Sequence, residues 1–364
     1  MPVLSRVQKL FPVPHIMSFP SVGVDVSDTS LKYIQFDRVH AHDVNLVTKY
    51  WGDLTMPSGI VDRGNVHDVA KLSAVLNEMR EKTNAQYVNM SLPEERAYLF
   101  ETTLPIDTPR KEIRGLIDFR LEENVPLSPR DAYFDYVIVG SDVKLRILHI
   151  IVSVYAQSTI NSYYDACVQA HLTPLSFEIE AQAIARASIP AQQAGTYMVV
   201  DFGKTRMGVG IVNNGILRYT STIEIAGEQI SADMRAVLGD VPESELTHIK
   251  NIKGLSHTKD NEQIASILRG YAETIVEELG IRIHYWDTRD IDSEARTIKK
   301  VIICGGSANL FGLPEFLSQK LELPTERAQV WANVLSLDNQ IPEITRRYSY
   351  GYGTAIGLAL RGFI

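Results

Sequence analysis

The chain has 364 residues, more than one hydrophobic core usually serves, so we expect at least two domains. Its formal net charge is −8 and it has no long basic run, which argues against a nucleic-acid-binding surface and against direct binding to anionic lipid. The sequence has neither a signal-peptide pattern nor an apolar stretch long enough to span a bilayer, which is typical of a cytosolic protein. The two cysteines, Cys167 and Cys304, are predicted to be buried thiols rather than a disulfide.

Two features near the N-terminus allow more than one interpretation. Five apolar residues fall on one helical face, which packs either on its own domain, as is usual, or on a partner or membrane surface. These residues are Val3, Leu4, Val7, Leu10 and Phe11. His40 and His42 could share one side of a strand, but the sequence offers no third ligand nearby, so we predict surface histidines rather than a metal site.

Residues 21–36, SVGVDVSDTSLKYIQF, predict two strands joined by a turn. Apolar residues alternate up to Asp25, small and hydroxyl residues follow from Ser27 to Ser30, and the alternation then resumes. Turn residues of this kind close many β-hairpins without a further role. They also offer backbone N–H groups and hydroxyls that bind phosphate. This hairpin alone does not decide between the two interpretations.

The stretch from residue 96 to residue 194 predicts an inserted unit and a return to the first domain. It contains the strand RAYLFETTLP, an amphipathic helix from Thr108 to Glu123, the strands AYFDYVIVG and LRILHIIVSVYA, and a helix from Ser158 to Ala170. A connecting strand and helix follow in LTPLSFEIEAQAIARA, with Glu180 at the junction. That carboxylate could orient a hydrolytic water, or it could simply be stabilised by the helix dipole.

Residues 199–212, VVDFGKTRMGVGIV, repeat the first hairpin in kind. Asp201 closes a strand as Asp25 does, and a Gly-Lys-Thr turn follows. A Walker A loop is excluded, because Met198 stands where that loop needs glycine and the pattern continues as a strand. Two such hairpins facing each other would hold a polyphosphate between them, and the two aspartates would reach a hydrated Mg²⁺ ion.

The C-terminal part begins with a charged, mainly helical stretch between residues 232 and 294. The segment KKVIICGGSANLFGLPEFLSQKL then predicts a buried strand, a Gly-Gly-Ser turn and a helix that opens near Pro314. Paired glycines allow backbone to approach a base or ribose closely, and Ser307 or Asn309 could hydrogen-bond it. The segment DNQIPEITRRYSYGYG has loop composition, and we expect it to pass close to the cleft.

In this order the motifs resemble those of the actin-like ATPase superfamily, which includes actin, sugar kinases, FtsA and MreB. More narrowly, the chain is similar to the PilM family of type IV pilus assembly proteins from about Val22 to Arg361. The stretches that carry the narrower resemblance are VGVDVSDTSLKYIQF, IDFRLEENVPLSPRDAYFDYVIVG, LTPLSFEIEAQAIARA, TSTIEIAGEQIS and YGTAIGLALRGF. The resemblance implies an α/β, actin-like fold of duplicated ribonuclease-H-like domains with an FtsA/PilM-type 1C subdomain and a small 2B subdomain.

The resemblance also implies four subdomains. Their expected bounds are 1–94 for 1A, with 172–195 and 346–364; 95–171 for 1C; 196–231 for 2A, with 296–345; and 232–295 for 2B.

ATP and Mg²⁺ are the cofactors that the resemblance implies, bound in the cleft between the two halves. Asp25 and Asp201 would hold the metal ion, and Glu180 with Asp201 would be catalytic. The residues implied to contact the nucleotide are Ser27, Asp28, Thr29, Lys32, Gly203, Lys204, Thr205, Gly227, Glu228, Lys250, Gly305, Gly306, Ser307 and Asn309. Because nothing in the sequence marks a strong general base, we expect at most slow ATP hydrolysis, with the nucleotide acting as a structural ligand or switch.

The implied partner is the N-terminal cytoplasmic peptide of a PilN-like inner-membrane protein, held in a groove between 1A and 1C. The protein would then work at the cytoplasmic face of the inner membrane, without binding nucleic acid, and self-association into filaments stays open. Two alternatives remain. An FtsA-like division protein would normally carry a membrane-seeking helix after its closing helix, where this chain ends at Ile364. A small-molecule kinase would need a catalytic aspartate, and none stands out.

Overall fold

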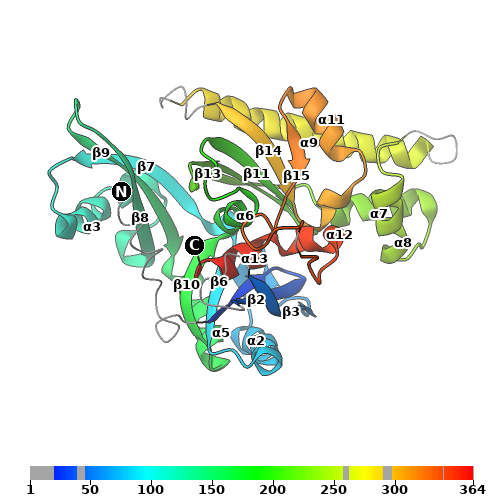
Figure 1. Ribbon diagram of the computed structural model, residues 1–364, viewed down its shortest axis with the longest axis horizontal. Helices are drawn as coiled ribbons and strands as arrows, with labels where there is room; N and C mark the ends of the chain where they lie inside the picture. The colour runs from blue at the N-terminus through cyan, green and yellow to red at the C-terminus, as the bar shows by residue number, and fades with distance from the viewer. Residues whose placement is uncertain (1–19, 39–45, 257–261, 290–296, 339, 364) are drawn as a thin grey trace.

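The computed structural model describes residues 20–38, 46–256, 262–289, 297–338 and 340–363. Two five-stranded sheets form its body, and a three-stranded sheet lies beside them on the left of Figure 1. The apolar face predicted from Val3 to Phe11 and the pair His40 and His42 lie outside the described residues. Among the helices of the described ranges, none is both long and apolar enough to cross a membrane.

The first sheet has the strand order β10-β6-β1-β2-β3. Its strands are β1 (Ser21–Val26), β2 (Ser30–Asp37), β3 (Val47–Thr55), β6 (Tyr87–Leu92) and β10 (Thr173–Ile179). Strands β1, β2 and β3 form an antiparallel meander, whereas β6 and β10 run parallel to β1. The apolar residues of β1 and β2 are buried because helices cover both faces of this sheet.

The second sheet repeats the first. It has the order β15-β14-β11-β12-β13, again an antiparallel meander joined by two parallel strands. Its strands are β11 (Thr196–Phe202), β12 (Met207–Asn213), β13 (Ile216–Ile223), β14 (Ile298–Cys304) and β15 (Thr325–Arg327). Because β11 takes the place of β1, and β12 that of β2, the predicted duplication of the chain is confirmed.

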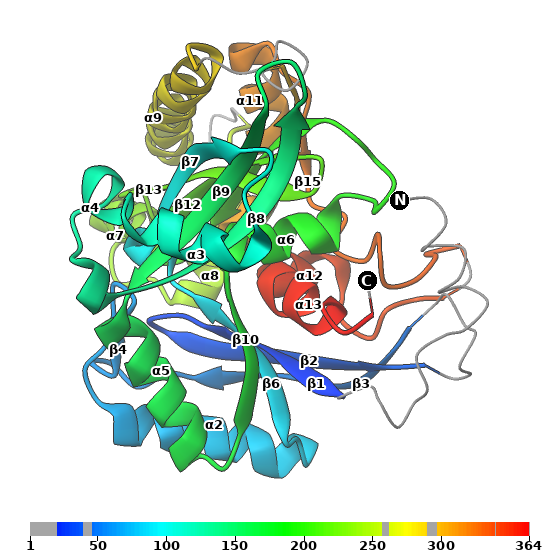
Figure 2. The same ribbon diagram turned by 90° about the vertical axis from the view of Figure 1, so that its left-hand side faces the viewer.

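Two helices, α6 (Glu180–Ser188) and α13 (Gly353–Leu360), lie between the sheets (Figures 1 and 2). Every residue of α13 is buried, and small residues let it approach its neighbours closely. A Cβ atom at Gly357 would lie 1.8 Å from the carbonyl oxygen of Ala183, and one at Gly23 would lie 2.1 Å from that of Ala355. The small residues of the closing helix therefore set the spacing of the layers.

Other helices cover the outer faces of the sheets. The first sheet, together with α2 (Val69–Thr83) and α5 (Gln157–Gln169), is called the first lobe below. The second sheet, with helices packed on its outer face, is called the second lobe. The helices of the second lobe are α7 (Gly227–Leu238), α8 (Glu243–Ile252), α9 (Glu262–Asp287) and α11 (Leu313–Leu321). The short elements β4 (Val61–Asp62), β5 (Asn65–Val66) and α12 (Arg346–Ser349) complete the two lobes.

The third sheet has the order β7-β9-β8 and a small core of its own. It consists of β7 (Tyr98–Pro105), β8 (Ala132–Asp142) and β9 (Ile147–Ala156), with α3 (Arg110–Asp118) and α4 (Leu121–Asn124) packed on one face. The single helix predicted from Thr108 to Glu123 is wrong, because a turn at Phe119 and Arg120 divides it. The N–H of Arg120 donates to Ile117 in a tight turn, and its guanidinium reaches Thr102 on β7.

Helix α5 packs on α2 in the core of the first lobe, although it lies within the range 95–171. Cys167 on α5 and Cys304 at the end of β14 are both free and buried, as predicted. The residue-level bounds of the four subdomains stay a prediction.

Candidate functional site

The first hairpin closes through its own hydroxyl groups. The N–H and the hydroxyl of Ser27 both donate to the carbonyl oxygen of Ser30, at 2.9 and 3.0 Å. Asp25, near the end of β1, accepts a hydrogen bond from Ser91 on the neighbouring strand and faces Lys32 across the hairpin. The tip residues Asp28 and Thr29 use their N–H groups for no hydrogen bond within the described residues. The tip therefore offers free backbone donors.

Hydrogen bonds from neighbouring segments hold the turn of the second hairpin in place. The N–H of Gly203 donates to the carbonyl of Arg206, which closes the turn. The carbonyl of Gly203 in turn accepts from the N–H of Gly227 and from the hydroxyl of Ser307, each at 3.2 Å. Within the described chain, the N–H groups of Lys204 and Thr205 donate to no other residue. This tip too presents free donors on a fixed backbone.

The Gly-Gly loop after β14 closes the site from a third side. Gly305 has φ +87°, and a Cβ there would lie 2.4 Å from the carboxylate of Asp201, so only glycine fits. The next residue, Gly306, faces open space. The loop thus lets the backbone run directly past the carboxylate of the second hairpin.

A cavity of about 550 Å³ lies between these three elements. It brings together twelve of the residues predicted for the site. They are Asp25, Ser27, Thr29, Lys32, Glu180, Asp201, Gly203, Lys204, Thr205, Gly305, Gly306 and Asn309. Thr345, Arg347 and Tyr348, from the segment expected to pass close to the cleft, also line it, although part of that segment is helix rather than loop.

The other predicted residues lie around this cavity without lining it. Gly227 and Ser307 brace the second hairpin, and Glu228 donates its N–H to the carbonyl of Lys204. Lys250 hydrogen-bonds the hydroxyl of Ser231 at 2.7 Å and pairs with Glu243. Asp28 pairs with Arg206 and lines a different cavity, described below. On α8, Thr247 and Asn251 reach the cavity instead of Lys250.

Carboxylates dominate the electrostatics of the cavity floor. Burial raises the pKa of Asp25, although the positive charge of Lys32 opposes the shift. Burial and the charge of Asp25 together raise the pKa of Asp201 to about 6. Burial also raises the pKa of Glu180 well above its ordinary value, against the opposing charge of Arg206. A cation placed between these groups would favour their ionised forms.

The residues present fit a metal-chelated polyphosphate. Two aspartates can hold a Mg²⁺ ion that keeps most of its waters, which suits a site where no cluster of three direct ligands occurs among the described residues. The free N–H groups of both hairpin tips and the side chains of Lys32 and Lys204 offer phosphate contacts. The cavity also has the size typical of small-ligand sites.

Glu94, two residues after the end of β6, is a buried carboxyl group that the sequence analysis missed. Its Oε1 accepts a hydrogen bond from the N–H of Ala181, and its Oε2 has no partner within the described residues. Its Oε2 also packs on Gly208, where a Cβ would lie only 2.0 Å from it. Burial, and then the charge of Asp201, raise the pKa of Glu94 to about 8.

We predict that Glu94 makes stability fall with rising pH. Its pKa in the folded state is above the ordinary value of 4.5, so the folded protein holds an extra proton between those pH values. The free energy of unfolding therefore decreases as pH rises through this window, by up to about 1.4 kcal/mol per unit for one proton. Glu94→Gln should flatten the decrease in denaturant titrations at pH 6, 7 and 8. The exposed control Glu122→Gln should leave it unchanged, and parallel curves for Glu94→Gln and the parent protein would contradict the assignment.

Between the third sheet and the first lobe lies a groove of about 570 Å³. One wall is the sheet face that points away from α3, with Tyr133, Val137 and Ile151. The other wall consists mainly of β10 and α6, including Phe177 and Arg186, and the start of β13 from the second lobe also contributes to it. In the described part of the chain, β10 and β8 are outermost strands of their sheets, so each presents a free edge to a possible partner.

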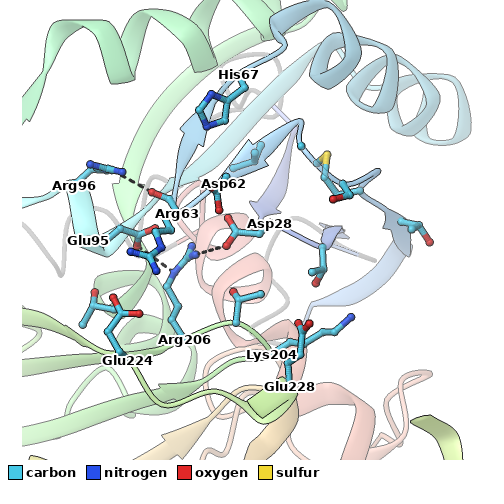
Figure 3. Close-up of a pocket in the computed structure, with 18 residues that line it drawn as sticks. Asp28, Asp62, Arg63, His67, Glu95, Arg96, Lys204, Arg206, Glu224 and Glu228 are labelled. Carbon is cyan, nitrogen blue, oxygen red and sulfur yellow. Dashed lines mark hydrogen bonds and ion pairs between the residues drawn. The ribbon is translucent and has the colours of Figure 1, made fainter. Parts of the chain in front are cut away.

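Another polar cavity, of about 890 Å³, lies on the opposite side of the hairpin tips (Figure 3). It shares Thr29, Lys204, Thr205 and Arg206 with the first cavity. The sequence analysis missed Arg206 and its ion-pair partner Glu95, and it assigned the other partner, Asp28, to nucleotide contact. The only local signal in the sequence is that Arg206 is a charged residue just before the apolar residues of the second hairpin. A single charged residue at such a position does not indicate an ion pair.

Comparison with known proteins agrees with this architecture. The sequence profile of the family "Type IV pilus assembly protein PilM" matches residues 23–363. Among solved structures, a PilM-PilN type IV pilus biogenesis complex superimposes with a TM-score of 0.76 at 16% identity, covering 95% of this chain and 99% of the other.

Two further structures are similar in fold. Ethanolamine utilization protein EutJ from Carboxydothermus hydrogenoformans has a TM-score of 0.53 at 15% identity, with 99% of each chain covered. MreB5 of Spiroplasma citri bound to ADP has a TM-score of 0.51 at 13% identity, with 86% of this chain and 93% of the other covered. At these identities the likeness shows the shared actin-like fold.

Proposed function

Because the chain belongs to the family of type IV pilus assembly proteins PilM, we propose that it binds the N-terminal cytoplasmic peptide of a PilN-like membrane protein. The protein would work at the cytoplasmic face of the inner membrane, held there through its partner. The family match favours this role over a division protein of the FtsA type and over a small-molecule kinase.

The groove between the third sheet and the first lobe is the observation that carries this proposal. An extended peptide gains affinity from backbone hydrogen bonds to a free strand edge and specificity from pockets for alternate side chains. The groove offers both, because the edge of β10 runs beside apolar side chains such as Tyr133 and Phe177. Arg186 and Arg361 both pair with Glu178 on its floor, so the groove also has polar contacts to offer.

We further propose that ATP with Mg²⁺ occupies the cavity between the hairpins as a structural ligand or switch. Asp25 and Asp201 would hold the hydrated ion, which supplies charge neutralisation for the phosphates when bound. Glu180 would orient water only weakly, because its burial favours the protonated form. The hairpin tips would position the phosphates, but no strong general base stands out among the described residues of the cavity, which supports slow turnover rather than efficient hydrolysis.

The test is direct binding of a synthetic peptide. We expect a fluorescently labelled N-terminal peptide of a PilN-like protein to bind the full chain saturably in an anisotropy titration, and a peptide of the same composition in reversed order to bind much more weakly. Repeating the titration with ATP and Mg²⁺ measures whether nucleotide changes the affinity. Equal anisotropy curves for the two peptides would contradict the proposal.

A further inference from the structure

Arg206 connects the two lobes through buried ion pairs. It is the first residue after the tip of the second hairpin, and its side chain is only 14% exposed. Its Nη1 atom lies 2.8 Å from Oδ2 of Asp28, and its Nε atom lies 3.1 Å from Oε2 of Glu95. Figure 3 shows this side chain rising from the second lobe to both carboxylates. One guanidinium is thus shared by two acidic groups of the other lobe.

Both partners are held in place by their own surroundings. Asp28 belongs to the turn of the first hairpin, and its second oxygen faces the N–H of Gly64 at 3.5 Å. Glu95 lies in a short 3₁₀ turn after β6, and its neighbour Arg96 donates to the carbonyl of Arg63 at 3.1 Å. The carboxylates therefore reach Arg206 from two separate, ordered segments of the first lobe.

The lobes also touch directly beside this ion pair. Glu94, the residue before Glu95, packs against Gly208, two residues after Arg206. Arg206 itself lines both cavities, so it forms part of the wall between them. The ion pairs of Arg206 therefore connect the two lobes at the hairpin tips, and the contact between Glu94 and Gly208 connects them beside these ion pairs.

We propose that Arg206 is a latch that holds the two lobes closed through Asp28 and Glu95. Every group in this contact belongs to the protein, so the closure needs no ligand. Removing one member of a buried ion pair leaves its partner charges unpaired, which strongly disfavours the paired conformation. Without Arg206, Asp28 and Glu95 face each other as like charges, and the lobes separate about the segments that connect them. The inference is independent of whether nucleotide binds in the cavity.

The distance between the lobes tests the latch. Spin labels at Ala74→Cys on α2 and Glu273→Cys on α9 occupy exposed positions of the first and second lobes, and the two native cysteines are buried. In nucleotide-free full-length protein we expect electron paramagnetic resonance to give a single narrow distance distribution. Arg206→Met should add a second population at longer distance, and Asp28→Asn, which keeps Glu95 as a partner, should add a smaller one.

Arg282→Met is the matched control. Arg282 is equally buried, at 14% exposure, but its partners Glu278 and Ser221 both lie in the second lobe. This variant should keep the single narrow distribution even where it lowers the melting temperature. The latch is overturned if Arg206→Met keeps the distribution of the parent protein, or if Arg282→Met broadens it to the same extent. Should Arg206→Met fail to fold, the comparison of Asp28→Asn with Arg282→Met decides in the same way.

Discussion

Replacing Asp201 with asparagine is expected to abolish the Mg²⁺-dependent stabilisation by ATP and, at the same time, to stabilise the nucleotide-free protein. Asparagine keeps the shape of the side chain but removes a negative charge from a buried site. That charge is what a hydrated Mg²⁺ ion would need from the second hairpin. The two effects have opposite signs, so a merely damaged protein cannot imitate them.

The gain in stability follows from the pKa of Asp201. Burial and the neighbouring charge of Asp25 raise this pKa to about 6, so at pH 7 the ionised group is held at a cost to the folded state. The sign is that of a carboxyl whose folded pKa is raised. Its ionisation lowers stability as pH rises from the ordinary pKa of 3.8 to about 6, and the cost is relieved as pH falls through that window. Asp201→Asn should remove this cost and flatten the pH dependence of stability between about pH 4 and pH 6.

Thermal melting with and without ATP and Mg²⁺ measures both effects. A ligand at 100 times its dissociation constant stabilises a protein by about 2.7 kcal/mol, a shift that melting curves resolve readily. The parent protein should show this shift at pH 7 and less of it at pH 5, where Asp201 is protonated. Asp107→Asn is the control, since Asp107 is exposed, pairs with Arg146 beside the third sheet and does not line this cavity. If Asp201→Asn keeps the full Mg²⁺-dependent shift of the melting temperature, Asp201 does not hold the metal ion.

The duplicated fold could be predicted because its signal is local. Each half carries a run of apolar residues that ends at an aspartate. In the first half Val22 and Val24 precede Asp25, and in the second half Val199 precedes Asp201. By contrast, the sequence near Phe119 carries no local signal for the break of the predicted helix. The break depends on Arg120 reaching a threonine of β7, which no periodicity reveals.

The same distinction between local and long-range signals applies to the candidate site. The hairpin tips and the Gly-Gly loop converge on one cavity because each follows its own strand: β11 and β14 are neighbours in the second sheet, and β1 holds the equivalent place in the first. The ion pair between Asp28 and Arg206 joins residues 178 positions apart, and the burial of Glu94 depends on packing against the other lobe. Contacts of that kind arise only when the lobes are assembled, so a single sequence gives no signal for them.

Replacing Val137 with glutamate is expected to weaken peptide binding by at least about tenfold, which corresponds to about 1.4 kcal/mol. Side chains alternate along β8, so Val137 faces the groove together with its cross-strand partner Ile151. A peptide that covers this position would leave the new carboxylate buried without a partner, which is costly. Val137 is 48% exposed in the protein alone, so the folded state should tolerate the change.

Ile138→Glu provides the comparison, because Ile138 is the next residue of the same strand and is similarly exposed, at 41%. It lies opposite Ile150 on the face that carries the core of the third sheet, and it does not line the groove. Anisotropy titrations with the labelled peptide should therefore give parent affinity for Ile138→Glu and reduced affinity for Val137→Glu, at equal melting temperatures. Equal losses in both variants would indicate an effect of added charge rather than of position. Unchanged affinity in both would place the peptide outside this groove.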